Sequence, residues 1–211
     1  MKNPILILTF LLTSALAAAQ NDPAAISVLD RFSSAALAAP SVTMDFDFEI
    51  NDLTDGSSSV NSGKIILSDD RYRLEMDDYI VWFNGETNWN YLVNEEEVTI
   101  TKPGEDEVSF LTRPSSIFSM YKSGYRTRLV DETADAWVID LYPEETDTDL
   151  IRVRLTILKS SLNPSAIEYK NRSGITYTVK VKSYDLRKKH DPSYFSFVRS
   201  DYRDAEVIDL R

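Results

Sequence analysis

A strict alternation of apolar and polar side chains over residues 42–50 constrains this chain more than any other feature of its sequence. The apolar members are Val42, Met44, Phe46, Phe48 and Ile50, and the polar ones between them are Thr43, Asp45, Asp47 and Glu49. Because successive side chains of a β-strand point to opposite faces of a sheet, this period of two predicts a strand with one buried face and one face in water.

The same kind of pattern recurs along the chain. Ten further segments are predicted to be strands: residues 60–68, 71–77, 79–84, 87–93, 97–101, 125–131, 135–142, 150–158, 164–171 and 174–185. Asn84-Gly85, between two of them, is typical of a two-residue hairpin turn. Connections this short favour antiparallel neighbours. The sequence therefore predicts a single, mainly β domain built on one curved antiparallel sheet of about eleven strands.

Two helices accompany the predicted strands. Asp22-Pro23 places an N-cap carboxylate before a proline at the first helical position, and apolar residues then recur at helical spacing as far as Pro40. Residues 114–121 predict a second, short helix after a loop at residues 102–113. Two amphipathic helices are too few to fill the hollow of a curled sheet, but they suffice to cover it.

The first nineteen residues are predicted to be a cleaved signal peptide. Lys2 supplies a positive charge, residues 4–16 are apolar but too short to cross a ~30 Å hydrocarbon core, and Ala17-Ala18-Ala19 offers small residues at the cleavage site. We expect cleavage after Ala19 and a mature domain over residues 20–211. No later stretch approaches the ~20 apolar residues of a membrane-spanning helix, and the cleavage region has no cysteine to carry a lipid anchor. The mature domain is therefore expected to be exported and free in solution.

Composition excludes several kinds of site. The chain has no cysteine and a single histidine, His190, which excludes disulfides, thiolate metal sites, cysteine nucleophiles and His-rich metal centres. Its 34 acidic residues against 23 basic ones give a net charge of -11, which argues against nucleic acid and against an anionic membrane surface as partners. We expect neither a metal nor a cofactor.

Some polar groups suggest catalysis or metal binding, but each has a simpler interpretation. Asp45, Asp47 and Glu49 share one strand face, where carboxylates can act as acid and base, yet a solvated outer face explains them. Residues 144–149 offer oxygens to Ca²⁺ but lack the glycine and terminal glutamate of an EF-hand loop. His190 keeps a Ser–His hydrolase as an alternative, although no GxSxG motif is present to hold a nucleophilic serine. The chain is therefore expected not to be an enzyme.

The apolar face of the predicted sheet leaves two interpretations open. Met, Phe, Trp, Tyr and Leu side chains beneath a helical cover suit an apolar ligand. The same residues equally suit a packed core. Periodicity alone does not distinguish a hollow sheet from a filled one.

Several stretches resemble the LolA family of periplasmic outer-membrane lipoprotein carriers. They are Val28-Leu29-Asp30-Arg31-Phe32, Gly63-Lys64-Ile65-Ile66-Leu67, Asp70-Arg71-Tyr72-Arg73-Leu74-Glu75-Met76, Phe83-Asn84-Gly85-Glu86-Thr87-Asn88-Trp89-Asn90-Tyr91, Pro114-Ser115-Ser116-Ile117-Phe118 and Val207-Ile208-Asp209-Leu210-Arg211. Their order and spacing agree with the family over nearly the whole mature chain. The Asn-Gly-x-Thr-x-Trp-x-Tyr hairpin followed by Pro-Ser-x-Ile-Phe is the most specific part.

The resemblance implies a fold and a task. The fold is an unclosed half-barrel of about eleven strands with helices over its concave face and a cavity for lipoprotein acyl chains. The implied partners are acylated lipoproteins, an inner-membrane ABC lipoprotein-releasing transporter and, in many members, an outer-membrane receptor lipoprotein. The implied location is the periplasm, and a monomer is expected for a shuttle.

One departure from the family concerns how the helical cover is held. Well-studied members carry an arginine in a Lys-Arg-Pro hairpin that holds the cover closed by hydrogen bonds. The corresponding hairpin here is Ser68-Asp69-Asp70. Arg71 and Arg73 are the candidate substitutes for that contact.

The candidate residues of the acyl-chain cavity are the apolar side chains of the matching strands and of the second helix. They are Met44, Phe46, Phe48, Leu74, Met76, Trp89, Tyr91, Ile117, Phe118 and Met120. Flexible methionines and flat aromatic rings give broad contact without demanding one ligand shape. The favoured function is a lipoprotein carrier between the two membranes. The alternatives are another periplasmic lipid or glycolipid binder or sensor of the same superfamily, and the Ser–His hydrolase.

Overall fold

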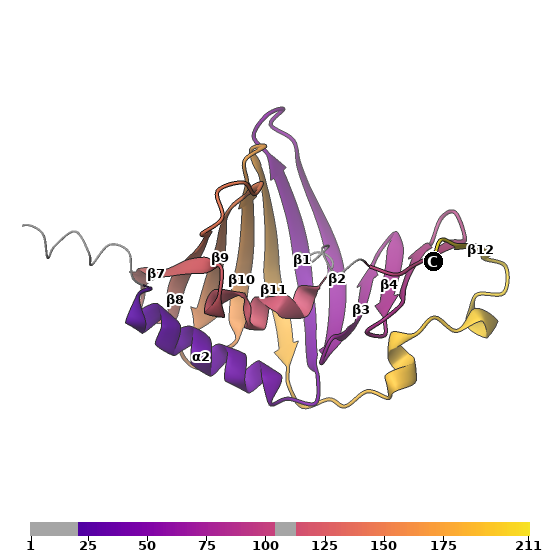
Figure 1. Ribbon diagram of the computed structural model, residues 1–211, viewed down its shortest axis with the longest axis horizontal. Coiled ribbons are helices and arrows are strands. Elements are labelled where there is room, and N and C mark those ends of the chain that lie inside the picture. The colour runs from indigo at the N-terminus through magenta and orange to yellow at the C-terminus, as the bar shows by residue number, and fades with distance from the viewer. Residues whose placement is uncertain (1–20, 104–112) are drawn as a thin grey trace, which may run out of the picture.

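The computed structural model of the protein describes residues 21–103 and 113–211. Its strands are β1 (Val42–Asp52), β2 (Ser58–Ser68), β3 (Arg71–Met76), β4 (Tyr79–Phe83), β5 (Asn88–Leu92), β6 (Glu97–Thr101), β7 (Tyr125–Glu132), β8 (Ala136–Pro143), β9 (Leu150–Leu158), β10 (Pro164–Asn171), β11 (Ile175–Asp185) and β12 (Glu206–Asp209). Across the described ranges these twelve strands form one open sheet, in the order β12-β6-β5-β4-β3-β2-β1-β11-β10-β9-β8-β7. Figure 1 shows the long strands β1, β2 and β11 side by side near its middle.

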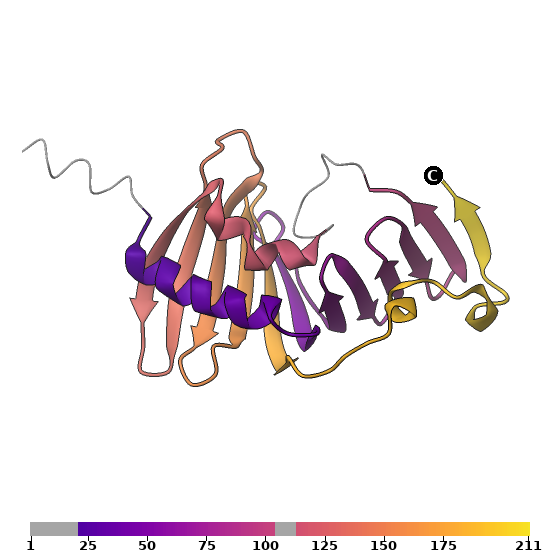
Figure 2. The same ribbon diagram turned by 60° about the horizontal axis from the view of Figure 1, so that its bottom comes forward.

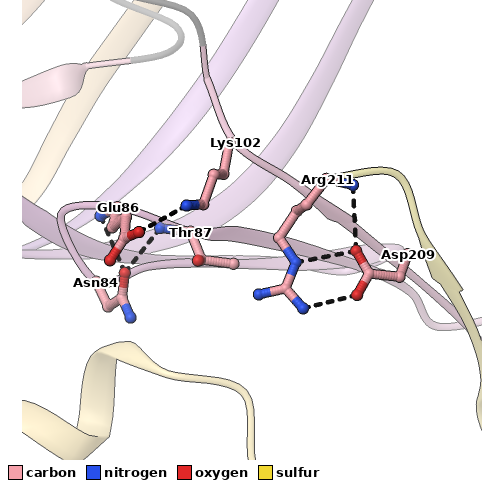
Figure 3. A network of polar contacts seen from close by, with 6 residues as sticks. All are labelled: Asn84, Glu86, Thr87, Lys102, Asp209 and Arg211. Carbon is pink, nitrogen blue, oxygen red and sulfur yellow. Dashed lines mark hydrogen bonds and ion pairs between the residues drawn. The ribbon is translucent and has the colours of Figure 1, made fainter.

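The mainly β, antiparallel fold expected from the period-two segments is confirmed, and each of the eleven predicted strands is present. The Asn84-Gly85 hairpin is present as well: the Asn84 Oδ1 accepts hydrogen bonds from the backbone N–H groups of Glu86 (3.0 Å) and Thr87 (2.8 Å), and Gly85 has φ 99° (Figure 3). A positive φ of this kind costs glycine little.

The strand β12 was not predicted, and it pairs with β6 in parallel. It is too short for its alternation to be recognised, because it has only four residues. Directly after it, the guanidinium of Arg211 pairs with the Asp209 carboxylate, while Lys102 at the end of β6 pairs with Glu86 (Figure 3). These contacts lie at the β12 edge of the sheet.

The predicted first helix is present as α2 (Pro23–Leu37). Asp22 caps it, since one carboxylate oxygen accepts from the N–H of Ala24 (2.9 Å). The other oxygen accepts from the N–H of Leu129 (3.1 Å), and the Asn21 Oδ1 accepts from the N–H of Thr127 (2.8 Å). The start of α2 is therefore attached to β7, the strand at one edge of the sheet.

The single helix predicted over residues 114–121 is wrong in kind. The segment forms two short 3₁₀ helices, η2 (Pro114–Phe118) and η3 (Met120–Lys122). Ser119 between them has φ -132° and ψ -19°, which breaks the helical geometry. Two further 3₁₀ helices, η4 (Pro192–Phe195) and η5 (Arg199–Asp201), lie in the C-terminal segment between β11 and β12.

Two sequence predictions fall wholly or largely outside the described residues. They are the signal peptide over residues 1–19 and the loop over residues 102–113, of which residues 104–112 are not described. Among the residues that are described, the helices are all too short or too polar to cross a bilayer.

We call the face of the sheet that α2 covers the inner face and the opposite one the outer face. The inner face carries the main hydrophobic cluster, to which α2 contributes Leu29 and Phe32. On the outer face of β1, Asp45 pairs with Lys64 (3.3 Å) and Asp47 with Lys182 (2.5 Å). The alternation of residues 42–50 therefore separates an apolar inner face from a charged outer face, as predicted.

Across strands β3 to β5, large apolar side chains appear on the outer face of the sheet as well as on the inner face. Cα partners place Leu74 and Val81 on the inner face, but Trp82 and Trp89 together on the outer face. On that outer face a second cluster forms around Val98, Ile100 and Ala205, with Trp89, Tyr91, Phe197 and Tyr202 packed against it. Figure 2 shows α2 crossing one half of the sheet and the C-terminal segment, in yellow, crossing the other half.

Candidate ligand pocket

One end of the inner face is hollow. A pocket of about 720 Å³ lies there, where η2 and η3 cross the ends of β9, β10 and β11. Its lining residues are Phe48, Ser116, Ser119, Met120, Lys122, Ser123, Tyr125, Thr148, Asp149, Leu150, Tyr169, Lys170, Asn171, Tyr177 and Val179. A volume of this size is within the usual range for a small-molecule site, ~300–1,000 Å³.

The sheet supplies the apolar surface of the pocket. The rings of Phe48 on β1 and Tyr177 on β11 stack with their centroids 6.0 Å apart. Tyr169 on β10 lies opposite Tyr177, since the two are Cα partners. Flat rings on three neighbouring strands give the pocket a smooth apolar floor.

The 3₁₀ segments above the pocket are fastened to α2 by side-chain hydrogen bonds. The Ser33 hydroxyl donates to the backbone carbonyl of Phe118 (2.5 Å), and the Tyr121 hydroxyl donates to the Asp30 carboxylate (2.6 Å). The rings of Phe32 and Phe118 also meet, with centroids 5.4 Å apart. Burial, together with the hydrogen bond to Asp30, raises the pKa of Tyr121 to about 12. This tyrosine therefore stays a neutral donor at any physiological pH.

The rest of the inner face is filled. Beneath η2, the described side chains leave a void of only about 30 Å³, bordered by Met44, Ile117, Phe118 and Tyr184 among others. That volume has room for about one water molecule and not for an acyl chain. The inner face is therefore hollow at the end near η3 and filled beneath η2.

The predicted cavity residues separate accordingly. Phe48 and Met120 line the large pocket, whereas Met44, Ile117 and Phe118 border the small void. Phe46, Leu74 and Met76 belong to the inner cluster but line neither space. Sequence reasoning missed most of the floor: Tyr125, Leu150, Tyr169, Tyr177 and Val179. The alternation over residues 174–185 contained a signal for the last two.

Trp89 and Tyr91 do not lie with the other predicted cavity residues. They belong to the cluster on the outer face, where Tyr91 packs edge-on against Tyr202 with ring centroids 4.8 Å apart. The physical reason is the parity of the hairpin. The inner-face positions of β5 are occupied by the asparagines on either side of Trp89, namely Asn88 and Asn90, which pair with the inner-face positions of β4.

Arg71 and Arg73 also project to the outer face and do not meet α2, η2 or η3 there. The guanidinium of Arg71 lies 5.3 Å from the ring centroid of Phe195. That of Arg73 lies 4.6 Å from the ring centroid of Tyr194 and 5.4 Å from that of Trp82. Both arginines contact the C-terminal segment, whereas the described side-chain hydrogen bonds between α2 and the 3₁₀ segments come from Ser33 and Tyr121.

Part of the pocket lining is polar. Lys122, Asp149 and several hydroxyl groups belong to it. The neighbouring acidic loop, residues 144–149, is held by Arg172, whose guanidinium donates to the carbonyls of Thr148 (2.8 Å) and Thr146 (3.1 Å). No group of three or more His, Cys, Asp or Glu side chains able to hold a metal is found in the described ranges. A pocket lining that combines apolar rings with charged and hydroxyl groups suits an amphiphile.

The groups that suggested acid–base chemistry are placed apart from the pocket. Asp45, Asp47 and Glu49 are paired with lysines on the outer face. His190 lies against the rings of Tyr194 and Phe195, and its Nε2 has no hydrogen-bond partner among the described residues. A serine–histidine pair at His190 is therefore not part of the described structure.

Comparisons with known proteins agree with this fold. A family model described as outer membrane lipoprotein carrier protein LolA matches residues 15–174. A search of curated proteins gave no match. Among solved structures, an uncharacterized conserved protein from Thermus thermophilus is 14% identical, with a TM-score of 0.56 over 88% of this chain and 99% of that one.

Two further solved structures are more distant. A putative outer membrane lipoprotein-sorting protein domain from Vibrio parahaemolyticus is 10% identical, with a TM-score of 0.47 over 85% of this chain and 98% of that one. A LolA superfamily protein from Nitrosomonas europaea is 10% identical, with a TM-score of 0.43 over 82% of this chain and 97% of that one.

Proposed function

Because the chain belongs to the family of LolA outer membrane lipoprotein carriers, we propose that it carries lipoproteins across the periplasm from the inner to the outer membrane. In this proposal the inner-face pocket receives lipoprotein acyl chains. The chain acts as a carrier and not as an enzyme. The first nineteen residues serve as its export signal, and acylated lipoproteins are its cargo.

The pocket at the hollow end of the inner face is the observation that carries this proposal. Its volume of about 720 Å³ is bordered on the sheet side by Phe48, Tyr169, Tyr177 and Val179, and by Met120 on the side of the 3₁₀ segments. A pocket of this kind takes a flexible hydrocarbon chain, because rings and a methionine conform to it without fixing its shape.

The energetics of the cargo explain why a carrier is needed. Exposing an acyl chain of ~16 carbons to water costs roughly 0.8 kcal/mol per methylene, or on the order of 12 kcal/mol per chain. A lipoprotein released from one membrane therefore needs an apolar container until it reaches the next. The container must also release the chain, which favours a cover that can move.

The cover in this proposal is the body formed by α2, η2 and η3. Side-chain hydrogen bonds from Ser33 and Tyr121 join α2 to the 3₁₀ segments. Along the inner face the body contacts the sheet through apolar side chains. We propose that it shifts away from the sheet when a chain enters, since apolar contacts are non-directional and tolerate small displacements.

The proposal includes the transport partners typical of the family. An inner-membrane ABC transporter loads the carrier, and the outer membrane, directly or through a receptor lipoprotein, unloads it. The charged outer face, where carboxylates alternate with lysines, keeps the carrier soluble between the two steps.

Binding of a palmitoylated peptide by the purified mature protein tests the proposal. The wild type should bind it, and Phe48→Asp should weaken binding at least about tenfold, because it places a carboxylate against the chain. The matched control is Val60→Asp, which adds the same charge at an exposed position of β2 and should bind as the wild type does. Equal binding by the two variants would contradict the assignment of the pocket.

Native mass spectrometry of the protein from its own periplasm distinguishes the cargo. An acylated peptide or lipoprotein as the co-purified ligand supports the carrier. A free lipid or glycolipid as the co-purified ligand would contradict the carrier function and favour a lipid binder or sensor of the same fold.

A further inference from the structure

The hollow and filled parts of the inner face meet at one side chain. On β1 the inner-face positions follow one another as Met44, Phe46 and Phe48, about 7 Å apart along the strand. Phe48 lines the large pocket and Met44 borders the small void. Phe46 lies between them and lines neither.

The neighbouring strand repeats this order. On β11, Val179 lines the large pocket and Tyr184 borders the small void. Val181 lies between them and is the Cα partner of Phe46, next to a bulge at Asp45 and Phe46. On β10 the two spaces are lined by adjacent inner-face residues, Tyr169 and Ile167. Two spaces that follow the same strands are thus separated at Phe46 and Val181.

A glycine lies beneath the Phe46 ring. Phe46 and Met76 both lie across from Gly63 on β2 as its Cα partners. A Cβ at Gly63 would come within 2.7 Å of Phe46 Cζ and 2.4 Å of Met76 Sδ. Glycine leaves room for both side chains in these positions, and Phe46, 6% exposed, packs over it.

We infer that the Phe46 side chain, packed between the two spaces and behind the residues that line the pocket, closes off the inner end of the acyl pocket and limits the length of chain that the protein accepts. A chain bound in the pocket extends past Phe48 toward the filled part of the inner face, where the packed Phe46 side chain stands between it and the small void. The void beyond, bordered by Met44 and Tyr184, is then reached only when that side chain is removed. This inference rests on the proposed acyl-binding function and adds a chain-length specificity to it.

The test is a binding series with otherwise identical octanoyl, lauroyl, palmitoyl and stearoyl peptides. In the wild type, affinity should rise with chain length and then level off. In Phe46→Ala the large pocket and the small void join, so the plateau should move to a longer chain. Each methylene newly taken from water contributes about fourfold in affinity. The ratio of stearoyl to lauroyl affinity should therefore rise about tenfold or more. Phe46→Leu should give a smaller rise and keeps the test usable if Phe46→Ala does not fold.

The matched control is Phe83→Ala. Phe83 is a buried inner-face phenylalanine, 5% exposed, on β4, a strand that contributes no residue to either space, so it does not lie between the two spaces as Phe46 does. Its alanine variant should lose stability to a similar extent and keep the wild-type length profile. A length profile that is the same in the wild type, Phe46→Ala and Phe46→Leu would overturn the inference and leave the acyl-binding function standing. Absence of binding at every length in the wild type would overturn the proposed function itself.

Discussion

The two hydrophobic clusters of this sheet differ in what covers them. The inner cluster lies beneath α2, η2 and η3, and its cover leaves a pocket of about 720 Å³ at one end. The outer cluster lies beneath the C-terminal segment, whose rings interlock with those of the sheet. Trp82 meets both Tyr202 (5.4 Å between centroids) and Phe197 (5.7 Å).

The comparison shows how one sheet serves two purposes. Edge-on aromatic pairs and a cation over a ring make the outer contact specific, since each needs one geometry. The inner pocket combines flat rings, two of which (Phe48 and Tyr177) are stacked, with the flexible side chain of Met120, so it accepts different occupants. Changes to the outer cluster should therefore alter stability, and changes to the inner pocket should alter ligand binding.

The largest expected effect is on the stability of the outer cluster. Trp82→Ala removes a ring that is 2% exposed and contacts two aromatic side chains. It should lower the free energy of unfolding by about 3–5 kcal/mol, as for other large aromatic residues in cores. Denaturant unfolding measures this, and palmitoyl-peptide affinity below the transition should not change. A loss of affinity in the folded variant would show that the two clusters are coupled.

The next largest effect concerns the inner pocket. Phe48→Ala removes a half-buried ring from the wall and should weaken palmitoyl-peptide binding about tenfold, because a side chain of this kind contributes ~1.5–3 kcal/mol of apolar contact. Its effect on unfolding should be smaller than that of Trp82→Ala. Calorimetric titration checks the first and urea unfolding the second. The reverse pattern, strong destabilisation with unchanged affinity, would mean that Phe48 belongs to a packed core.

A smaller effect is expected at the contact between η3 and α2, within the cover. Tyr121→Phe removes the hydrogen bond to Asp30 and should cost about 1 kcal/mol of stability. Because η3, which lies over the pocket, is then held less firmly to α2, release of a bound acyl peptide should be several-fold faster. Stopped-flow displacement measures the release rate. The control is Tyr142→Phe, which removes a tyrosine hydrogen bond to Asp140 and leaves the cover untouched; equal acceleration in both variants would refute the role of Tyr121.

The smallest effect is a pH dependence at the C-terminal segment. Burial, and the neighbouring Lys188, lower the pKa of His190 below its ordinary value of 6.5. The unfolded chain therefore binds this proton before the folded one does. The contribution of neutral His190 is complete above pH 6.5 and is lost as the pH falls through its lowered pKa. His190→Gln should remove this part of the pH dependence of unfolding; an unchanged profile would exclude His190 as its source.

The strands could be predicted from the sequence because alternation is a local signal. Recognising that residues 42–50 form a strand with one buried face needs only the order of apolar and polar residues. The prediction of one short helix at residues 114–121 was wrong in kind. The segment meets α2, which is remote in sequence, through the hydrogen bond from Ser33 to the Phe118 carbonyl, and local spacing carries no information about such a contact. The strand β12 has too few residues to show a period.

Only part of the candidate site could be predicted from the sequence, for a related reason. Alternation tells which residues share a face within one strand, so Phe48 was found with Met44 and Phe46. It does not tell which face of a later strand is the inner one. The run of apolar residues in β4, Tyr79–Phe83, was the available signal that apolar side chains occupy both faces of the sheet there. On the next strand, β5, the apolar residues Trp89 and Tyr91 lie on the outer face.

Which part of the inner face is hollow could not be predicted at all. Met44 and Phe48 are both apolar and two strand positions from Phe46, yet one borders a void of about 30 Å³ and the other a pocket of about 720 Å³. The difference depends on where η2 and η3 cross the sheet, which is a property of the whole packed structure.

The three methionines of the described domain allow the most direct test of the inner pocket. Met120 lines it, Met44 borders the small void, and Met76 is packed over Gly63. Isotope-labelled methionine methyl groups can be followed by NMR while a palmitoylated peptide is added. We predict that the Met120 signal shifts strongly with the binding curve while that of Met76 changes least. Saturable binding that leaves the Met120 methyl unmoved would contradict the account.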